Sequence, residues 1–347
     1  MEPMRASTRV TIKDIAQQAG VSKTTVSFAF NEPTKLSSST CTRVLAIATE
    51  LGYVPDPVAR TLTTRRTGSV GLLLPQALQE ALQNPYLGEI LQGLGASCEG
   101  QSRSLLLMPP VQGQVMEAAR RAAVDALVAI GVGPEHQVVE LMRQRQIPLV
   151  TIDGLPGESL SNVGIDDEAA AYALMQHVLG LGHRRLAVVA LEPEVYNNTV
   201  GQTSAVSMRR MAGFSRALQE AGLAADAISM FRVDSSFSGG MAAADKVLNN
   251  TDCTAILAMA DILAMGIYAR CADRGILIPA SMSVAAFDDI QISQILKPGL
   301  TTISQSGFAK GTEAGRIIHS LLDGGPIEQV LMPATLQVRS SVGQAPV

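Results

Sequence analysis

The apolar runs that recur after residue 68 constrain the fold more than any other feature of the sequence. Each run is short, and a longer amphipathic segment separates most of them from the next. The runs cover residues 70–74, 105–108, 126–130, 149–152, 186–191, 255–259 and 284–287. Buried apolar strands that alternate with helices form parallel sheets with helices on both faces. The sequence therefore predicts an α/β core over residues 69–347.

The length of this core indicates more than one ordinary doubly wound sheet. Two similar lobes, each with its own sheet, would bury a core of this size. A single (β/α)8 barrel would also use a long run of alternating strands and helices. The periodicity alone leaves both architectures open.

The residues before the core have a different pattern, with short helices and almost no strand character. Thr11 can cap a helix that ends at Gly20, and Ser22 can cap a second helix that reaches Phe30. A third helix is expected from the serines at 37–39 to Leu51. Three short helices, with a tight turn between the first two, predict a helix-turn-helix within residues 8–56.

The first 31 residues also carry a family motif. The segment from Val10 to Asn31 reads VTIKDIAQQAGVSKTTVSFAFN. It resembles the head of the lactose/galactose-repressor (LacI/GalR) family, whose pattern is roughly T-[IL]-x-D-[IV]-A-x-x-A-G-V-S-x-x-T-V-S-R-x-[LF]-N. The resemblance continues through Leu51-Gly52-Tyr53 and Ala59-Arg60-x-Leu62 to the end of the sequence. It implies a sequence-specific transcription regulator of the repressor type, with a two-lobed core like that of periplasmic binding proteins.

The second helix, Ser22 to Asn31, is expected to read the DNA bases. Helix positions three or four apart share a face, and one face carries Lys23, Thr24, Ser27 and Phe28. Lysine can donate to guanine, threonine serves several base edges, and an apolar ring can contact a thymine methyl. A second set is expected to anchor phosphates: Thr11, Ser22, Thr25 and Asn31. The family usually has Arg at the position of Phe28, so the preferred base there should differ from that of relatives.

Residues 57–68 are interpreted as a hinge helix and linker. Asp56 is a suitable N-cap and Pro57 suits the first position of a helix that would end near Thr64. In the family a leucine of this helix enters the minor groove, and Leu62 matches it; such a wedge kinks the duplex. The alternative is that Leu62 is a core residue. The resemblance also adds Tyr53 and Arg60 to the DNA-binding set, and Arg60 is placed to meet a flanking phosphate.

Two heads must span a pseudo-palindromic operator, so a homodimer is expected. The sequence lacks the heptad tail that makes some relatives tetrameric.

The core is expected to bind a small-molecule effector, most simply a carbohydrate, between its lobes. One lobe is expected over residues 69–163 and 292–324, and the other over 164–291 and 325–347. The chain would cross between the lobes near 162–165, 290–294 and 323–327. The matched family positions and neighbouring hydroxyl acceptors are Tyr86, Asp153, Arg210, Asp234, Asp261 and Asp288. Carboxylates suit polyols because each oxygen accepts more than one hydrogen bond.

Each of these residues also has a structural alternative. Asp261 and Asp288 can serve only as helix caps, Arg210 can pair with an acid, and Tyr86 can pack between lobes. Ala260 replaces the usual Asn of the family, which removes one hydrogen-bonding side chain from the cleft. Residues 76–83 form an insertion at its rim.

Charge and composition exclude other classes of protein. Residues 1–66 carry a net charge of +4, whereas the remainder carries −8, as expected when one end meets a polyanion. The four cysteines form no CxxC pair, and neither a signal peptide nor an apolar run of roughly 18 residues is evident. A cytoplasmic protein without a membrane partner is expected.

Known catalytic and cofactor motifs are also missing from the sequence. It has no HExxH, no Walker motif and no dinucleotide-binding loop around Gly93-x-Gly95. We therefore expect no enzyme, no cofactor and no metal. Whether the effector weakens or strengthens DNA binding stays open.

Overall fold

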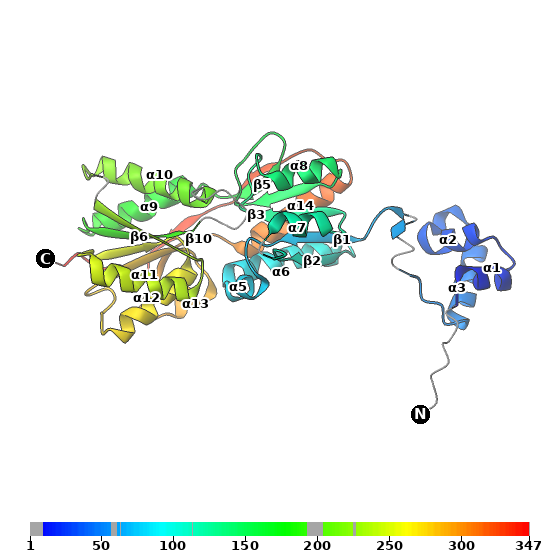
Figure 1. The fold of residues 1–347 in the computed structure, drawn as a ribbon, viewed down its shortest axis with the longest axis horizontal. Helices are drawn as coiled ribbons and strands as arrows, with labels where there is room; N and C mark the ends of the chain where they lie inside the picture. The colour runs from blue at the N-terminus through cyan, green and yellow to red at the C-terminus, as the bar shows by residue number, and fades with distance from the viewer. Residues whose placement is uncertain are drawn as a thin grey trace, which may run out of the picture. The chain divides into compact units, whose positions relative to one another are not determined.

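The computed structural model describes residues 10–56, 61–62, 64–112, 114–192, 204–224 and 227–346. The chain forms two compact units, Met1–Thr67 and Gly68–Val347. Figure 1 shows the helical first unit and the α/β second unit.

The first unit is a small helical bundle. Its elements are α1 (Ile12–Ala19), α2 (Lys23–Asn31), a 3-10 turn (Pro33–Lys35) and α3 (Ser38–Glu50). The turn between α1 and α2 begins at Gly20, whose φ of 64° is in the left-handed region that favours glycine. The Ser22 hydroxyl then accepts a 3.0 Å hydrogen bond from the backbone N–H of Thr25. The predicted helix-turn-helix is therefore confirmed.

Residues from all three helices form the core of this unit. Ile15, Val26 and Val44 are fully buried where α1, α2 and α3 meet. The ring of Phe30 packs against Tyr53 with 5.5 Å between ring centroids. The opposite face of α2 therefore stays free of the core.

The second unit contains two six-stranded sheets. The first has the order β11-β5-β4-β3-β1-β2, and the second has the order β12-β10-β9-β8-β6-β7. All neighbours are parallel except β10 and β12. The strands of the first sheet are β1 (Ser69–Leu73), β2 (Ser104–Met108), β3 (Ala126–Ile130), β4 (Leu149–Ile152), β5 (Ser161–Gly164) and β11 (Gln329–Leu331). Those of the second are β6 (Leu186–Leu191), β7 (Ile228–Val233), β8 (Ala255–Ala258), β9 (Ser283–Asp288), β10 (Thr301–Ser304) and β12 (Thr335–Gln337).

Helices cover both faces of each sheet, which makes two similar lobes and excludes the barrel. The first lobe has α5 (Leu78–Gln83), α6 (Pro85–Gly100), α7 (Val115–Arg121), α8 (Gln137–Gln144) and α14 (Gly307–Leu322). The second has α9 (Asp167–Gly180), α10 (Ala205–Glu220), α11 (Phe237–Asn250), α12 (Asp261–Asp273) and α13 (Gln291–Ile295). Each lobe buries two apolar clusters, one on each face of its sheet.

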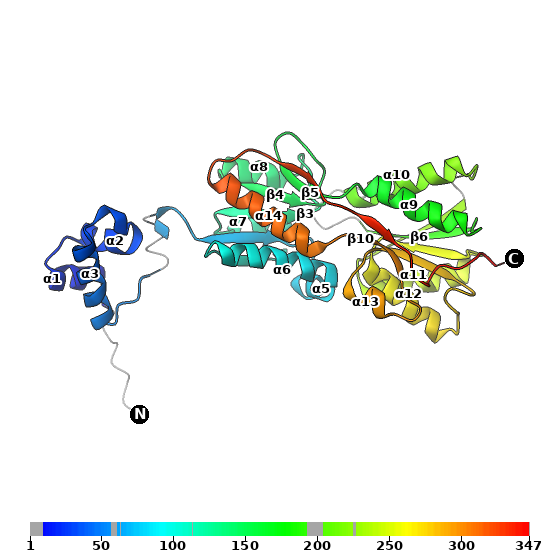
Figure 2. The same ribbon diagram turned by 180° about the vertical axis from the view of Figure 1, so that it is seen from behind.

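The lobe boundaries predicted from the sequence need two corrections. The first crossing, between β5 and α9, falls at 165–166, beside the expected 162–165. However, β10 pairs with β9 in the second sheet, so the second crossing falls at 305–306 instead of 290–294. Likewise β11 pairs with β5 in the first sheet, which moves the third crossing from 323–327 to 332–334. Figure 2 shows this last segment, in red, running from the first lobe to the second. Strands of three or four residues carry too little pattern to be assigned to a sheet from sequence.

Gly93 serves helix packing instead of nucleotide binding. It lies in α6, and a Cβ there would be 2.0 Å from the backbone oxygen of Phe308 in α14. The two helices can approach this closely only because the position has no side chain.

Candidate functional site

The exposed face of α2 carries the residues predicted to read DNA. Lys23 and Thr24 are exposed, and Ser27 and Phe28 are partly exposed. Asn31 donates a 3.3 Å hydrogen bond from its side-chain amide to the Ser27 hydroxyl. Apart from Phe28 this face is polar, and it lies outside the core, which is what a helix in the major groove requires.

Three of the four predicted phosphate anchors lie at the starts of α1 and α2, and the fourth, Asn31, ends α2. The backbone N–H of Thr11 donates to Asp14 Oδ2 at 2.8 Å, and the Thr11 hydroxyl donates to the same oxygen at 2.7 Å. The hydroxyls of Ser22 and Thr25 are 2.9 Å apart. Their hydroxyl groups are therefore fixed at helix N-termini, where backbone N–H groups favour anions.

Phe28 has a cation beside it that the sequence pattern did not reveal. The ammonium of Lys35, from the 3-10 turn after α2, lies 5.0 Å from the centroid of the Phe28 ring. The same ammonium is 2.5 Å from Glu32 Oε2. Lys35 therefore places an ammonium, paired with Glu32, beside the position where the family pattern has Arg. Reasoning from α2 alone missed it because Lys35 follows the helix.

Replacing Phe28 with Arg should change the preferred operator half-site at one base pair. The substitution exchanges an apolar ring, suited to a thymine methyl, for a fork of donors suited to guanine. It also replaces the ring that stacks under Lys35 with a like charge. In vitro selection from random duplexes would measure the effect, with Phe28→Leu as the control that keeps an apolar side chain. Identical selected sequences for the wild type and Phe28→Arg would rule out a base contact at this position.

Three predicted DNA-binding residues lie outside α1 and α2: Tyr53, Arg60 and Leu62. Tyr53 is half-buried against Phe30 and so also supports the core of the first unit. Leu62 is 79% exposed, which disfavours the alternative of a core leucine. Arg60 lies outside the described residues.

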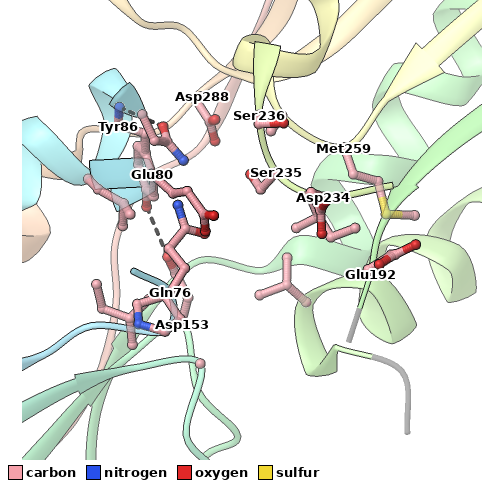
Figure 3. Close-up of a pocket in the computed structure, with 18 of the residues that line it drawn as sticks. Gln76, Glu80, Tyr86, Asp153, Glu192, Asp234, Ser235, Ser236, Met259 and Asp288 are labelled. Atoms are coloured by element: carbon pink, nitrogen blue, oxygen red, sulfur yellow. Dashed lines mark hydrogen bonds between the residues drawn. The ribbon is translucent and has the colours of Figure 1, made fainter. Parts of the chain in front are cut away.

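A cavity of about 290 Å³ lies between the two lobes of the second unit. Its walls come from the carboxyl ends of strands in both sheets and from the start of α6 (Figure 3). Five of the six predicted effector-binding residues line it: Tyr86, Asp153, Arg210, Asp234 and Asp288.

Tyr86 and Asp153 are held by a buried cation that the sequence did not reveal. The Tyr86 hydroxyl donates to Asp153 Oδ2 at 2.9 Å, and the Lys310 ammonium donates to Asp153 Oδ1 at 2.5 Å. Lys310 is fully buried and also donates to Gln305 Oε1 at 2.7 Å. Burial raises the pKa of Tyr86 well above its ordinary value, so the phenol keeps its proton and donates it to Asp153.

Arg210 both lines the cavity and forms a buried ion pair. Its Nε donates to Asp167 Oδ1 at 2.9 Å, and an Nη donates to the backbone oxygen of Met259. The guanidinium carbon is 3.9 Å from the centroid of the Phe287 ring. Burial raises the pKa of Asp167, but the charges of Arg210 and Arg209 outweigh this and hold the pKa below its usual value. The predicted cavity contact and the alternative ion pair therefore coexist at Arg210.

Arg209 connects the two lobes. It extends from α10 of the second lobe and donates to Asp167 Oδ2 at 2.7 Å. It also donates to the backbone oxygens of Asp153 at 3.1 Å and Gly154 at 3.2 Å, at the end of β4 in the first lobe. One guanidinium thus joins the walls of the cavity.

Asp261 does not line the cavity, which corrects the prediction that it binds the effector. Its Oδ2 accepts from the backbone N–H of Ile290 at 3.0 Å and from the Ser293 hydroxyl at 2.5 Å. Its Oδ1 accepts from the Thr302 hydroxyl at 2.7 Å. Because both oxygens are bonded inside the second lobe, Asp261 fixes α13 and β10 behind the site.

Asp288 faces the cavity and interacts electrostatically with Asp261. It is 6% exposed, and its Oδ1 accepts from the Gln305 amide at 2.7 Å. Burial raises the pKa of Asp288 to about 7. Burial, and then the charge of Asp288, raise the pKa of Asp261 to about 8.

Asp261→Asn should flatten the pH dependence of stability between pH 5 and 8. Because both folded-state pKa values are raised, the folded protein binds more protons than the unfolded chain in this window. Stability therefore falls as pH rises, by up to about 1.4 kcal/mol per pH unit for each group. The variant removes one of the two groups. Urea unfolding at pH 5, 6, 7 and 8 would measure the slope, with Glu99→Gln, an exposed carboxylate elsewhere, as control. An Asp261→Asn slope equal to that of the control would contradict the raised pKa.

Two other kinds of site are absent from the described residues. No group of three or more His, Cys, Asp or Glu side chains is placed there to hold a metal ion. In the same part of the chain, no helix is both long enough and apolar enough to cross a membrane.

Comparisons with known proteins assign both units of the chain. The description "Bacterial regulatory proteins, lacI family" matches residues 11–56, and "Periplasmic binding protein-like domain" matches residues 175–342. The HTH-type transcriptional regulator Rv3575c of Mycobacterium tuberculosis is 35% identical over 340 residues, which cover 93% of this chain and 94% of that protein.

Solved structures share the fold. The lac repressor dimer bound to operator and the anti-inducer ONPF has a TM-score of 0.76 at 22% identity, covering 96% of this chain and 99% of that one. The transcriptional regulator CelR in complex with cellobiose has a TM-score of 0.68 at 24% identity, covering 96% and 100%. With the matched head, the two-lobed core and the relative at 35% identity, this chain belongs to the LacI family of DNA-binding bacterial transcription regulators.

Proposed function

We propose that this protein represses transcription from a pseudo-palindromic operator, which it binds as a homodimer in the cytoplasm. A small polyhydroxylated effector, most simply a sugar or sugar derivative, binds between the lobes of the core and changes the affinity for the operator. The observation that carries this proposal is the cavity whose walls come from both lobes, because a ligand there contacts two bodies at once.

The head supports the DNA-binding part of the proposal. The exposed face of α2 presents Lys23 and Thr24 to the major groove, while fixed hydroxyls at helix starts bind phosphates. Leu62, which is highly exposed, serves as the minor-groove wedge of the hinge. The lac repressor structure, a dimer on its operator, supports the same arrangement here.

The cavity supports the effector part. Asp153 and Asp288 present carboxylate oxygens from opposite lobes, and carboxylates bind hydroxyl groups well. The cellobiose complex of a relative with the same fold agrees with a carbohydrate ligand. The effector acts through different affinities for two lobe arrangements, because a ligand that binds both equally shifts nothing. The Arg209 contacts between the lobes are the first that a change in lobe angle would alter.

In vitro selection with the full-length protein tests the DNA-binding part. Duplexes with a random central region should converge on an inverted repeat, because a two-fold dimer reads two half-sites of opposite orientation. Binding to the selected duplex should weaken steeply with salt, as expected when Lys and Arg displace counterions. Failure of any sequence to become enriched would refute the proposal, and enrichment of a single half-site would refute the dimeric mode.

A further inference from the structure

Two neighbouring carboxylates stand at the edge of the second sheet, facing the cavity. In the paired strands β6 and β7, Leu191 lies opposite Val233, and the N–H of Glu192 donates to the Val233 oxygen at 2.9 Å. Glu192 and Asp234 follow these paired residues, and parallel strands lie about 4.8 Å apart. Both side chains line the cavity (Figure 3).

No cation of the described residues neutralises this pair. The side chains of Glu192 and Asp234 form no ion pair or hydrogen bond with any residue that the structure describes. The sequence of residues 193–203, which follows Glu192, contains a further glutamate and no Lys or Arg. Across the cavity, the insertion that includes α5 contributes a third carboxylate, Glu80, which also has no ion partner among the described residues. The cavity therefore has a surplus of negative charge at its rim.

The cations near the cavity are already committed to protein groups. The Arg210 guanidinium is bonded to Asp167 and the Met259 oxygen. The Lys310 ammonium is bonded to Asp153, Tyr86 and Gln305. The Lys310 ammonium has no proton left for a ligand, whereas the Arg210 guanidinium uses only its Nε and one Nη in these bonds. An anionic group placed at the rim would meet repulsion from the carboxylates of Glu192, Asp234 and Glu80.

A separate observation indicates what the inner part of the cavity binds. The amide nitrogen of Gln76 is buried and has no hydrogen-bond partner among the described residues, and Gln76 lines the cavity on the first-lobe side (Figure 3). A buried amide without a partner costs free energy. Gln76 as a whole is only partly buried, so its side chain can turn this nitrogen towards a ligand hydroxyl. The hydroxyl oxygen then accepts a hydrogen bond while its proton is donated to a carboxylate such as Asp153.

We infer that the effector is a hydroxylated molecule that carries a positively charged nitrogen, as an amino sugar does. Glu192 and Asp234 bind the ammonium group, and Gln76 with the carboxylates of the inner wall binds the hydroxyls. This inference rests on the proposed function and narrows the class of its ligand. It disfavours effectors whose anionic group would lie at this rim, as in phosphorylated sugars and sugar acids.

Thermal-shift titrations with matched probes test the charge of the ligand. The probes are glucose, galactose and mannose, each as the neutral hexose, the 2-amino sugar, the 6-phosphate and the uronic acid, with the full-length protein at pH 7. A cleft ligand raises the unfolding temperature by mass action. We expect an amino sugar to stabilise the protein at a concentration at least about tenfold lower than its neutral counterpart, and the anionic members to be weaker still.

The double variant Glu192→Gln/Asp234→Asn should reduce this preference to less than about twofold. The control Glu99→Gln/Glu158→Gln removes two exposed carboxylates outside the cavity and should preserve the preference. The inference is overturned if neutral or anionic sugars bind more tightly than the amino sugars, or if none of the amino sugars stabilises the protein. An unchanged preference in the double variant would overturn it as well.

The outcome is distinguishable from failure of the proposed function. A neutral sugar that binds the cleft and shifts operator affinity leaves the function standing and removes the charge assignment. An amino sugar that binds the cleft without changing operator affinity leaves the charge assignment standing and contradicts the proposed function.

Discussion

Lys310→Met is expected to lower the free energy of unfolding by about 3–5 kcal/mol, because it leaves Asp153 as a buried carboxylate without its counter-charge. The Lys310 ammonium is fully buried and makes three hydrogen bonds, to Asp153, Tyr86 and Gln305. Methionine fills a similar volume, so the cost should come from the lost charge instead of from a cavity. Urea unfolding of the full-length protein at pH 7 measures it.

A second substitution separates the charge effect from packing. In Lys310→Met/Asp153→Asn the uncompensated charge is gone, and the Tyr86 hydroxyl can donate to the oxygen of the new side-chain amide as it did to the carboxylate. We expect the double variant to recover at least half of the lost stability. Lys246→Met, at an exposed position of α11, should cost less than about 0.5 kcal/mol. If Lys310→Met costs as little as that control, Lys310 does not stabilise Asp153.

Thr24→Glu should lower operator affinity by at least about 100-fold while leaving the fold intact. The side chain is exposed near the start of α2, on the face proposed to enter the major groove. A carboxylate there would meet the phosphates and base-edge acceptors, and like charges brought together at an interface cost several kcal/mol. A glutamate in the first turn of a helix is itself favourable, so the stability of the head should not fall. Fluorescence anisotropy with the selected operator measures the affinity.

Thr49→Glu is the matched control, because it adds the same charge to an exposed position in the last turn of α3. It should weaken operator binding by less than about threefold, through long-range repulsion only. Equal losses of operator affinity in Thr24→Glu and Thr49→Glu would show that α2 does not contact the DNA more closely than α3 does.

The head could be predicted closely from the sequence because its signals are local. Ser22 caps α2 through a residue three positions away, and Gly20 ends α1 by its own backbone conformation. The alternation of strands and helices in the core was equally readable. The sheet membership of β10 and β11 was not, because it depends on hydrogen bonds to strands that are distant in sequence.

The cavity residues also divide into those with a local signal in the sequence and those that only the fold brings to the site. Motif resemblance located Tyr86, at the start of α6, and Arg210, in the second turn of α10, and the place of Asp153 after β4 indicated that carboxylate. Lys310 lies within α14 and meets Asp153 only through the fold, so no spacing in the sequence reveals it. Asp261 follows a strand as the ligand-binding carboxylates do, yet three donors from residues 290–302 hold it behind the site.

Operator affinity measured with and without the cleft ligand tests the central claim most directly. The wild type would be titrated against the selected operator by fluorescence anisotropy, alone and with a saturating amount of the probe that best stabilises the core. Our account predicts a change of at least about fivefold in Kd. It also predicts that Asp288→Asn, which alters a cavity carboxylate, shifts the ligand concentration needed without changing operator affinity in the absence of ligand. An operator Kd that stays the same when the cleft is saturated would contradict the account.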